Sequence, residues 1–179
     1  MTVRRESTAI AEVVAARTRD VRDFPQPGVL FRDLTPLFAD ATSFRTVIDA
    51  LAATAQDYDV VAGVEARGFL LAAAIGYAAR AGVVPVRKAG KLPGPVISET
   101  YALEYGEATI EMRADALRPG ARVLVVDDVL ATGGTLAATL RLLRRVGAEI
   151  TGSAVILELI GLGGRAAVAP DDVIALRSL

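Results

Sequence analysis

Apolar residues recur along this chain in two patterns, and each pattern predicts a different kind of secondary structure. Apolar positions three or four residues apart indicate amphipathic helices, whereas short runs rich in valine indicate buried strands. The predicted helices are Thr8–Arg17, Thr42–Gln56, Gly68–Gly82 and Thr135–Gly147. The predicted strands are Tyr58–Val64, Val83–Lys88, Val123–Val126 and Glu149–Ile160. Because strands and helices alternate, we expect an α/β fold with a doubly wound, mostly parallel sheet that is flanked by helices.

Two longer segments break this alternation. Asp23–Phe38 carries three prolines and a Pro-Gly pair, so we expect a fixed loop without regular structure that exposes Leu30 and Phe31. The alternative interpretation is a loop that only covers the edge of the core, because scattered exposed apolar residues are common. Ala89–Met112 alternates apolar and polar residues on both sides of Gly106, which predicts an antiparallel hairpin that acts as a flap.

Composition removes several classes of chemistry. The 179 residues include no cysteine and no histidine, which excludes Cys and His nucleophiles, Ser-His-Asp triads, zinc fingers and disulfide frameworks. A net charge of −1 favours no nucleic-acid partner. The longest apolar run, around Gly68–Ala79, is too short to span a bilayer, and the N-terminal stretch reaches polar residues too early for a signal peptide. We therefore expect a soluble, cytoplasmic, single-domain protein with no membrane partner.

The stretch Val123–Thr135, VLVVDDVLATGGT, joins a buried strand to a helix through a glycine-rich turn. Glycine tolerates left-handed dihedral angles and has no Cβ, so the backbone N–H groups of the turn can converge on one phosphate. These N–H groups belong to Thr132, Gly133, Gly134 and Thr135. Asp127 and Asp128 lie at the end of the strand, where open α/β sheets bind ligands, and carboxylates suit vicinal hydroxyls. A Gly-Gly turn alone is ordinary, but together these groups predict a ribose 5-phosphate site.

Positively charged residues are expected near the same edge of the sheet. Arg67 lies in the turn after the strand Tyr58–Val64, which places its guanidinium close to the phosphate turn. A solvent-exposed turn arginine is the alternative interpretation. The only two lysines, Lys88 and Lys91, follow directly on Arg87 and lie within four residues of each other. Two flexible ammonium groups therefore lie close together, at the end of the strand Val83–Lys88 and just after it.

These segments together resemble the type I phosphoribosyltransferase family. VLVVDDVLATGGT is similar to the thirteen-residue phosphoribosyl-pyrophosphate motif of the family, and FPQPGVLFRD, EARGF, VRKAGKLPGP and SETYALEYG are similar to its adenine-using branch. The resemblance covers about Asp23–Leu159. It implies that adenine and phosphoribosyl pyrophosphate give AMP and pyrophosphate with Mg²⁺. It also implies a homodimer of one domain, residues 1–179, with an N-terminal hood (about 1–36) and a flexible flap (about 89–112).

The resemblance also implies roles for individual residues. It implies that adenine is bound by Leu30, Phe31 and Arg32. It assigns the pyrophosphate to residues in two segments, which are Glu65, Ala66 and Arg67 in the first and Arg87, Lys88 and Lys91 in the second. It also implies a cis peptide bond in the first segment. It assigns the phosphoribosyl group and AMP to Asp127, Asp128, Ala131, Thr132, Gly133, Gly134 and Thr135. It places Tyr101 and Tyr105 in the flap and implies that Glu104, also in the flap, is the catalytic residue that handles the N7 proton of adenine. It further implies that Mg²⁺ has no direct protein ligand and is held through substrate and water.

Two alternatives stay open at the level of sequence. The first is an enzyme of the same fold that acts on a pyrimidine or a 6-oxopurine. Two features favour adenine instead: Ala131 stands where 6-oxopurine enzymes have an aspartate, and no lysine follows Lys91. The second is a regulator that senses phosphoribosyl pyrophosphate, but about twenty residues before the hood loop are too few for a winged helix. The sequence also leaves open whether Arg87 serves its own subunit or a neighbouring one.

Overall fold

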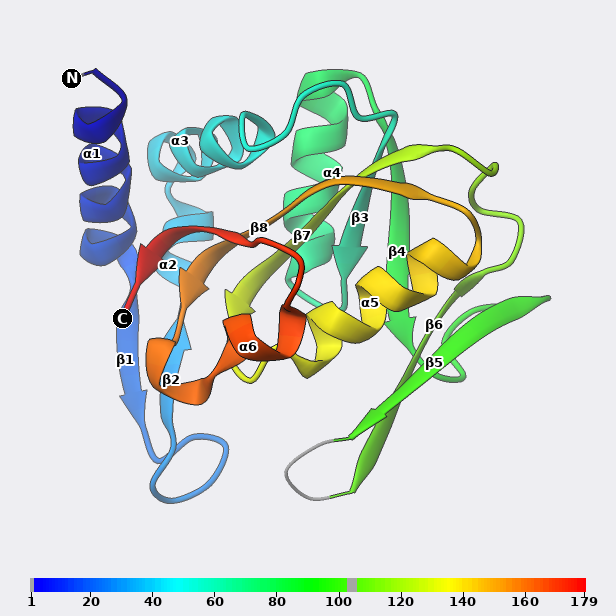
Figure 1. The fold of residues 1–179 in the computed structure, drawn as a ribbon. Coiled ribbons are helices and arrows are strands. Elements are labelled where there is room, and N and C mark those ends of the chain that lie inside the picture. Colours follow the sequence, from blue (N-terminus) through cyan, green and yellow to red (C-terminus); the bar gives the residue numbers. More distant parts are fainter. Residues whose placement is uncertain (1, 103–105) are drawn as a thin grey trace.

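The main sheet has seven strands in the part of the chain that the computed structural model describes, residues 2–102 and 106–179. The strands are β3 (Val60–Val64), β4 (Gly82–Lys88), β5 (Val96–Ala102), β6 (Glu107–Arg113), β7 (Arg122–Leu130), β8 (Glu149–Glu158) and β9 (Ile174–Ser178). They are arranged in the order β5-β6-β4-β3-β7-β8-β9 (Figure 1). The strands from β4 to β9 in this order run parallel, while β6 is antiparallel to both β4 and β5. The predicted mostly parallel α/β sheet is confirmed.

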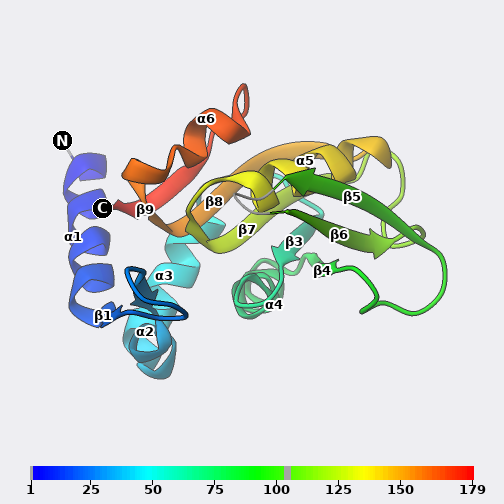
Figure 2. The ribbon, with the colours of Figure 1, turned by 90° about the horizontal axis from the view of Figure 1, so that it is seen from below.

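Helices cover both faces of this sheet. They are α1 (Thr2–Arg17), α2 (Thr35–Ala39), α3 (Ala41–Ala52), α4 (Gly68–Ala79), α5 (Gly134–Arg145) and α6 (Gly164–Val168), with a short 3₁₀ turn η1 (Ile160–Leu162). Figure 2 shows α5 and α6 on one face of the sheet and α2, α3 and α4 on the other. Among the described residues, no helix has the length and apolar character needed to cross a membrane.

Strand β7 lies at the centre of the molecule and contributes to two hydrophobic cores. Val123 and Val125 belong to the core under α5, whereas Leu124 and Val126 belong to the core under α3 and α4. Successive side chains of a strand point to opposite faces, so a strand buried on both faces is apolar at every position. This is why β7 contains an uninterrupted apolar run from Val123 to Val126.

The loops after three parallel strands meet at one edge of the sheet. β7 pairs with β3 and β8 on either side, and Val126 is aligned with Gly63 of β3 and with Ala154 of β8. Because the three strands run in the same direction, the segments 65–67, 131–133 and 159–163 follow them at the same edge. This edge therefore carries the candidate site.

The expectation of an irregular loop over Asp23–Phe38 is wrong for its second half. Strand β2 (Leu30–Asp33) pairs antiparallel with β1 (Arg19–Arg22), and helix α2 follows it. Pro36 does not interrupt α2, because it lies in the first turn, where its missing N–H would have no helical partner. The other prolines of this segment lie in the turn between β1 and β2. The hood is therefore a short β-ribbon followed by a helix.

Both ends of the chain contain more regular structure than the sequence pattern indicates. Helix α1 begins at Thr2 instead of about Thr8. The closing segment after β8 contains η1, α6 and β9, and β9 adds a parallel strand beside β8, with Ile174 opposite Ala154. The pattern of β9 is short, and its pairing partner is about twenty residues away in sequence, so local spacing gives little sign of it.

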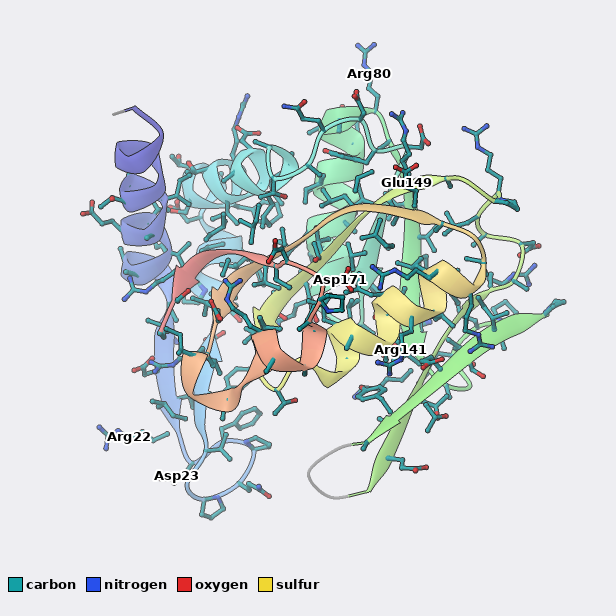
Figure 3. All side chains as sticks on the ribbon, in the orientation of Figure 1. Arg22, Asp23, Arg80, Arg141, Glu149 and Asp171 are labelled. Carbon is teal, nitrogen blue, oxygen red and sulfur yellow. The ribbon has the colours of Figure 1, made fainter. Side chains whose placement is uncertain are left out.

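The antiparallel hairpin is confirmed, with β5 paired to β6 along its whole length. Its tip, residues 103–105, lies outside the described residues. Glu99 of β5 accepts hydrogen bonds from Arg141 at 2.7 Å and from Arg145 at 3.0 Å, both on α5. Figure 3 shows Arg141 on the side of α5 that faces the hairpin. The middle of β5 is thus attached to the helix that begins at the glycine-rich turn.

Candidate active site

The turn between β7 and α5 lines a cavity of about 80 Å³. Gly133 precedes α5 with φ 81°, a left-handed conformation that L side chains rarely adopt. A Cβ at this position would lie 2.4 Å from the carbonyl oxygen of Gly164, so space excludes a side chain as well. All five predicted residues from Ala131 to Thr135 line the cavity, at the N-terminus of the 12-residue helix α5. Free N–H groups and the helix dipole make this cradle a site for an anion.

The acid pair Asp127 and Asp128 lies on β7, directly before the cradle. Oδ1 of Asp127 accepts a hydrogen bond from the backbone N–H of Asp128 at 2.8 Å, and Oδ2 of Asp128 lies 2.6 Å from Nε of Arg67. Burial raises the pKa of Asp127 well above its ordinary value, and the adjacent charge of Asp128 raises it further. Burial also raises the pKa of Asp128, although Arg67 opposes this shift. The pair can therefore hold a proton and offer a sugar diol a donor as well as acceptors.

Arg67 connects the acid pair with the hood. Besides its contact with Asp128, its guanidinium lies 5.1 Å from the ring centroid of Phe31, which is a cation–π distance. The loop reaches this position because Gly68 packs closely on β7, where a Cβ would lie 2.9 Å from the carbonyl oxygen of Val126. Arg67 thus lies at the same edge of the sheet as the phosphate turn, as predicted, and its ion pair with Asp128 distinguishes it from a turn arginine that contacts only solvent.

A larger cavity of about 710 Å³ lies between the hood and the edge of the sheet. The predicted residues that line it are Leu30, Phe31, Arg32, Arg67, Asp128 and Ala131. Phe31 packs edge-to-face on Phe24, with ring centroids 5.1 Å apart, and Arg32 forms an ion pair with Asp20 of β1. These contacts fix the hood side of a cavity whose volume suits a small planar ligand.

The opposite wall of this cavity was not predicted from the sequence. It consists of Leu159, Gly161, Leu162 and Leu179. The backbone N–H of Leu159 donates to the carbonyl of Leu130 at 2.9 Å, which places the η1 turn beside the end of β7. The signal that could have found these residues is the position of Leu159, directly after a strand parallel to β7, because loops after parallel strands share an edge.

The six predicted pyrophosphate residues lie in two adjoining segments: the loop after β3, and the end of β4 with the loop that follows it. The peptide bond between Glu65 and Ala66 is cis, as the resemblance implies. Oε2 of Glu65 accepts hydrogen bonds from Nε of Arg87 at 3.3 Å and from the backbone N–H of Lys88 at 3.0 Å. Arg87 also donates to the carbonyl of Lys91 at 3.0 Å. Glu65 therefore ties the two loops together.

Tyr101 brings the end of β5, next to the hairpin tip, into contact with the cradle. Its hydroxyl lies 2.8 Å from Oγ1 of Thr135, and a Cβ at Gly134 would lie 3.1 Å from the Cδ2 atom of its ring. The other two predicted flap residues, Glu104 and Tyr105, lie outside the described residues, so their roles stay predictions.

The acidic side chains of the site fit a Mg²⁺ ion that arrives with a phosphorylated substrate. Within residues 2–102 and 106–179, no group of three or more His, Cys, Asp or Glu side chains is arranged to hold a metal. At the edge of the sheet lies the acid pair Asp127 and Asp128, in which buried Oδ2 of Asp128 is ion-paired with Arg67 but has no hydrogen-bond partner among the described residues. Mg²⁺ is usually bound by one or two carboxylates together with water and substrate phosphates.

Comparison with known proteins gives close relatives over the whole chain. The phosphoribosyl transferase domain family matches residues 38–174. An adenine phosphoribosyltransferase from Clavibacter sepedonicus is 59% identical to this chain, over 96% of the chain and 90% of the relative. The adenine phosphoribosyltransferase from Mycobacterium avium (strain 104) is 57% identical to this chain, over 97% of the chain and 97% of the relative.

Solved structures agree with the sequence relatives. The adenine phosphoribosyltransferase from Rhodothermus marinus superposes with a TM-score of 0.91 at 44% identity, over 96% of this chain and 99% of that one. The Saccharomyces cerevisiae enzyme, crystallised with adenine and an imino-altritol bisphosphate, superposes with a TM-score of 0.88 at 35% identity, over 94% of this chain and 99% of that one.

Proposed function

The chain belongs to the phosphoribosyltransferase family, in its adenine-using branch, and from this premise we propose how its residues share the reaction. It is a pentosyltransferase of purine salvage that transfers the 5-phosphoribosyl group from phosphoribosyl pyrophosphate to adenine, which gives AMP and pyrophosphate. The bond from C1′ to the pyrophosphate oxygen breaks, and a bond from C1′ to N9 of adenine forms. The observation that carries our assignment is Arg67, which contacts both the acid pair and the aromatic ring of the hood.

We assign adenine to the larger cavity. The ring of Phe31 offers a stacking surface, and base–aromatic stacking is worth about 1–3 kcal/mol. Main-chain groups of Leu30 and Arg32 pair with the edge of the base, because one residue supplies both a donor and an acceptor, as N1 and the 6-amino group require. The side chain of Arg32 takes no part in this pairing, since it forms an ion pair with Asp20.

We assign the ribose and its 5-phosphate to the acid pair and the cradle. The phosphate accepts hydrogen bonds from the N–H groups and hydroxyls of the cradle at the positive end of α5. Asp127 and Asp128 hold the ribose hydroxyls and, as carboxylates, tolerate positive charge at the sugar carbon. C1′ becomes oxocarbenium-like as pyrophosphate departs, so negative charge next to the sugar lowers the barrier.

The pyrophosphate is assigned to the two adjoining loops. Arg67 and Arg87 offer planar guanidinium groups, which fix the geometry of phosphate oxygens, whereas Lys88 and Lys91 offer flexible ammonium groups that follow the departing anion. When bound together with the substrate, Mg²⁺ would neutralise part of the pyrophosphate charge, and the acid pair Asp127 and Asp128 would face it through water. Glu65 supports this half of the site by holding Arg87 and the backbone of Lys88.

The base that accepts the N7 proton of adenine is, in our proposal, Glu104. The support is the resemblance of SETYALEYG to the family motif, together with the alanine at position 131, which leaves no carboxylate at that position of the cradle. The described part of the hairpin supports its placement, because Tyr101 contacts Thr135 of the cradle at 2.8 Å. A positioned general base contributes about 10²–10⁴ to the rate.

We further propose that the enzyme is a homodimer that associates through α4. This helix and the start of β4 expose large apolar side chains: Leu70 is 53% exposed, Tyr77 90% and Val83 44%. A contiguous exposed apolar patch is typical of a protein interface. The patch is continuous with the pyrophosphate loops, because α4 begins directly after Arg67.

The cytoplasm is the location that we propose. Phosphoribosyl pyrophosphate carries several negative charges and does not cross a bilayer unaided. The enzyme therefore has to work in the compartment in which this substrate is made.

Incubation of the purified protein with labelled adenine, phosphoribosyl pyrophosphate and Mg²⁺ tests the assignment. We expect AMP and pyrophosphate in equal amounts, with hypoxanthine, guanine and xanthine competing poorly. Asp128→Asn should reduce this activity strongly, whereas Asp115→Asn, which alters an exposed acid paired with Arg113, should not. A folded protein that forms no AMP, or that prefers another base, would contradict the proposal.

A further inference from the structure

Glu111 is a buried carboxylate beside the pyrophosphate loops, and the assignment above gives it no role. It lies on β6, opposite Arg87 of β4 in the antiparallel register, and it is 5% exposed. A glutamate is rarely buried unless its charge is paired. Its partners therefore indicate what this charge does in the structure.

Consecutive backbone amides of the loop after β4 converge on this carboxylate. Oε1 of Glu111 accepts hydrogen bonds from the backbone N–H of Lys91 at 2.9 Å and from that of Leu92 at 3.0 Å. Burial acts to raise the pKa of Glu111, but the N–H groups of Gly90, Leu92 and Lys91 outweigh it and hold the pKa below its ordinary value. Gly90 has φ +79°, a left-handed conformation that lets successive N–H groups point the same way. The loop is an anion nest, and Glu111 is the anion in it.

The same loop is also connected to the arginine of the pyrophosphate site. Arg87 donates to the carbonyl of Lys91 at 3.0 Å, and its Nε donates to Glu65 at 3.3 Å. Two carboxylates therefore fix the end of β4 and the loop after it. Glu65, directly after β3, binds Arg87 and the backbone of Lys88, and Glu111 of β6 binds the backbone of the loop. Without Glu111, the N–H groups of Lys91 and Leu92 would lose their acceptor on β6, and the loop would stay attached to this strand only on either side of them, through Ala89 and Pro93. The carbonyl of Lys91 that Arg87 contacts would then be less firmly fixed.

We infer that Glu111 is a positioning residue for the pyrophosphate-binding cations, because it fixes the backbone that carries Lys91 and the carbonyl that holds Arg87. This inference rests on the proposed function, in which those cations bind pyrophosphate. Since Glu111 occupies the N–H groups of the loop, pyrophosphate meets the cationic side chains of the loop and not its amides. Loss of the carboxylate therefore weakens the binding of phosphoribosyl pyrophosphate while leaving adenine binding intact.

Substitutions of Glu111 test this role, with Glu107→Gln at an exposed position of the same strand as the matched control. We expect the KM for phosphoribosyl pyrophosphate to rise about tenfold in Glu111→Ala and less in Glu111→Gln, whose amide oxygen still accepts hydrogen bonds. The KM for adenine and the kcat should stay within about twofold of wild type. An equal rise in both KM values overturns the inference, and so does an unchanged KM for phosphoribosyl pyrophosphate. A lowered KM for phosphoribosyl pyrophosphate also overturns it, because it would mean that the freed amides bind phosphate themselves.

A double-mutant cycle separates positioning from a general loss of structure. If Glu111 acts partly through the Lys91 side chain, the Glu111→Ala change should raise the KM for phosphoribosyl pyrophosphate by a smaller factor in a Lys91→Ala background than in wild type, because only the route through the backbone carbonyl and Arg87 remains. Independent, multiplicative effects of the two substitutions overturn the inference. A structural role alone would not make the effect of one substitution depend on the presence of the other side chain.

Hydrogen exchange in the wild-type protein gives a test that needs no variant to fold. The amides of Lys91 and Leu92 should be protected without ligand and should stay protected when pyrophosphate and Mg²⁺ are added. Rapid exchange in the ligand-free protein overturns the inference. A wild-type protein that forms no AMP rejects the proposed function and the inference with it, whereas an active wild type with normal Glu111 variants rejects the inference alone.

Discussion

Replacement of Arg67 by methionine should destabilise the protein in a pH-dependent way. Methionine keeps an apolar stem beside Phe31 but removes the cation that lies 2.6 Å from Asp128, whose side chain is 9% exposed. Removing one partner of a buried ion pair costs about 3–5 kcal/mol when the other charge stays behind. The Arg67 side chain is 33% exposed, so solvent already screens part of the attraction. We therefore expect a loss of about 1–3 kcal/mol at neutral pH.

The pH dependence of this loss follows from the raised pKa of Asp128. A carboxyl group whose pKa is higher in the folded protein than in the unfolded chain holds more protons in the folded state, so stability falls as the pH rises between the two pKa values. Loss of the Arg67 charge raises the folded pKa of Asp128 further and extends this interval upward. The difference between variant and wild type should therefore be smaller at acid pH, where the carboxyl group becomes protonated in both proteins, than at neutral pH and above.

Urea unfolding followed by far-ultraviolet circular dichroism measures this difference, because the chain has no tryptophan for fluorescence. Arg45→Met is the matched control: Arg45 pairs with Asp49 on the surface of α3, and its side chain is 84% exposed. The control should change stability by less than about 0.5 kcal/mol at both pH values. A loss in Arg67→Met that is the same at low and high pH, or no larger than in Arg45→Met, would refute the reasoning.

Gly133→Ala should raise the KM for phosphoribosyl pyrophosphate about tenfold or more, because residue 133 has a left-handed conformation and its new Cβ would meet the carbonyl oxygen of Gly164. Steady-state kinetics with each substrate varied in turn measures this change. An equal rise in the KM for adenine would contradict the prediction. Glu104→Ala should retain substrate binding, measured by calorimetry, while kcat falls about 10²–10⁴-fold, and normal turnover would remove the assignment. Tyr77→Arg should convert the proposed dimer into monomers in light scattering, because it places a charge in the apolar patch of α4; a dimer that persists would show that association uses another surface.

The elements with strong local patterns could be predicted from the sequence. In α3, Val47, Ile48 and Leu51 are buried on one stripe, as their spacing indicates. The alternation of such helices with apolar strands was enough to predict the mostly parallel sheet, and the position of Arg67 beside the acid pair followed from it. These features depend on the chain's own spacing and on the rule that loops after parallel strands meet at one edge.

The remaining features depend on contacts between distant segments. Strand β2 forms because β1 pairs with it, and β9 forms because β8 offers a free edge, although neither has a strong pattern of its own. Leu159 lines the larger cavity only because η1 turns back toward the hood. The sequence pattern indicates that Glu111 is a polar position in a hairpin strand. It is nevertheless buried, because the loop 90–92 folds over it. The chemical roles of Leu30 and the other site residues stay predictions.

The close packing around the glycine-rich turn also limits how this catalyst can be re-engineered. A methyl group added to Gly133 or Gly164 would lie 2.4 Å from a backbone oxygen, and a backbone atom, unlike a side-chain atom, cannot rotate out of the way. A methyl group added to Gly161, on the wall of the base cavity, would meet nothing within 4 Å. A mutant library that seeks an altered acceptor base should therefore diversify the η1 wall and the hood, and keep the residues that surround the phosphate constant.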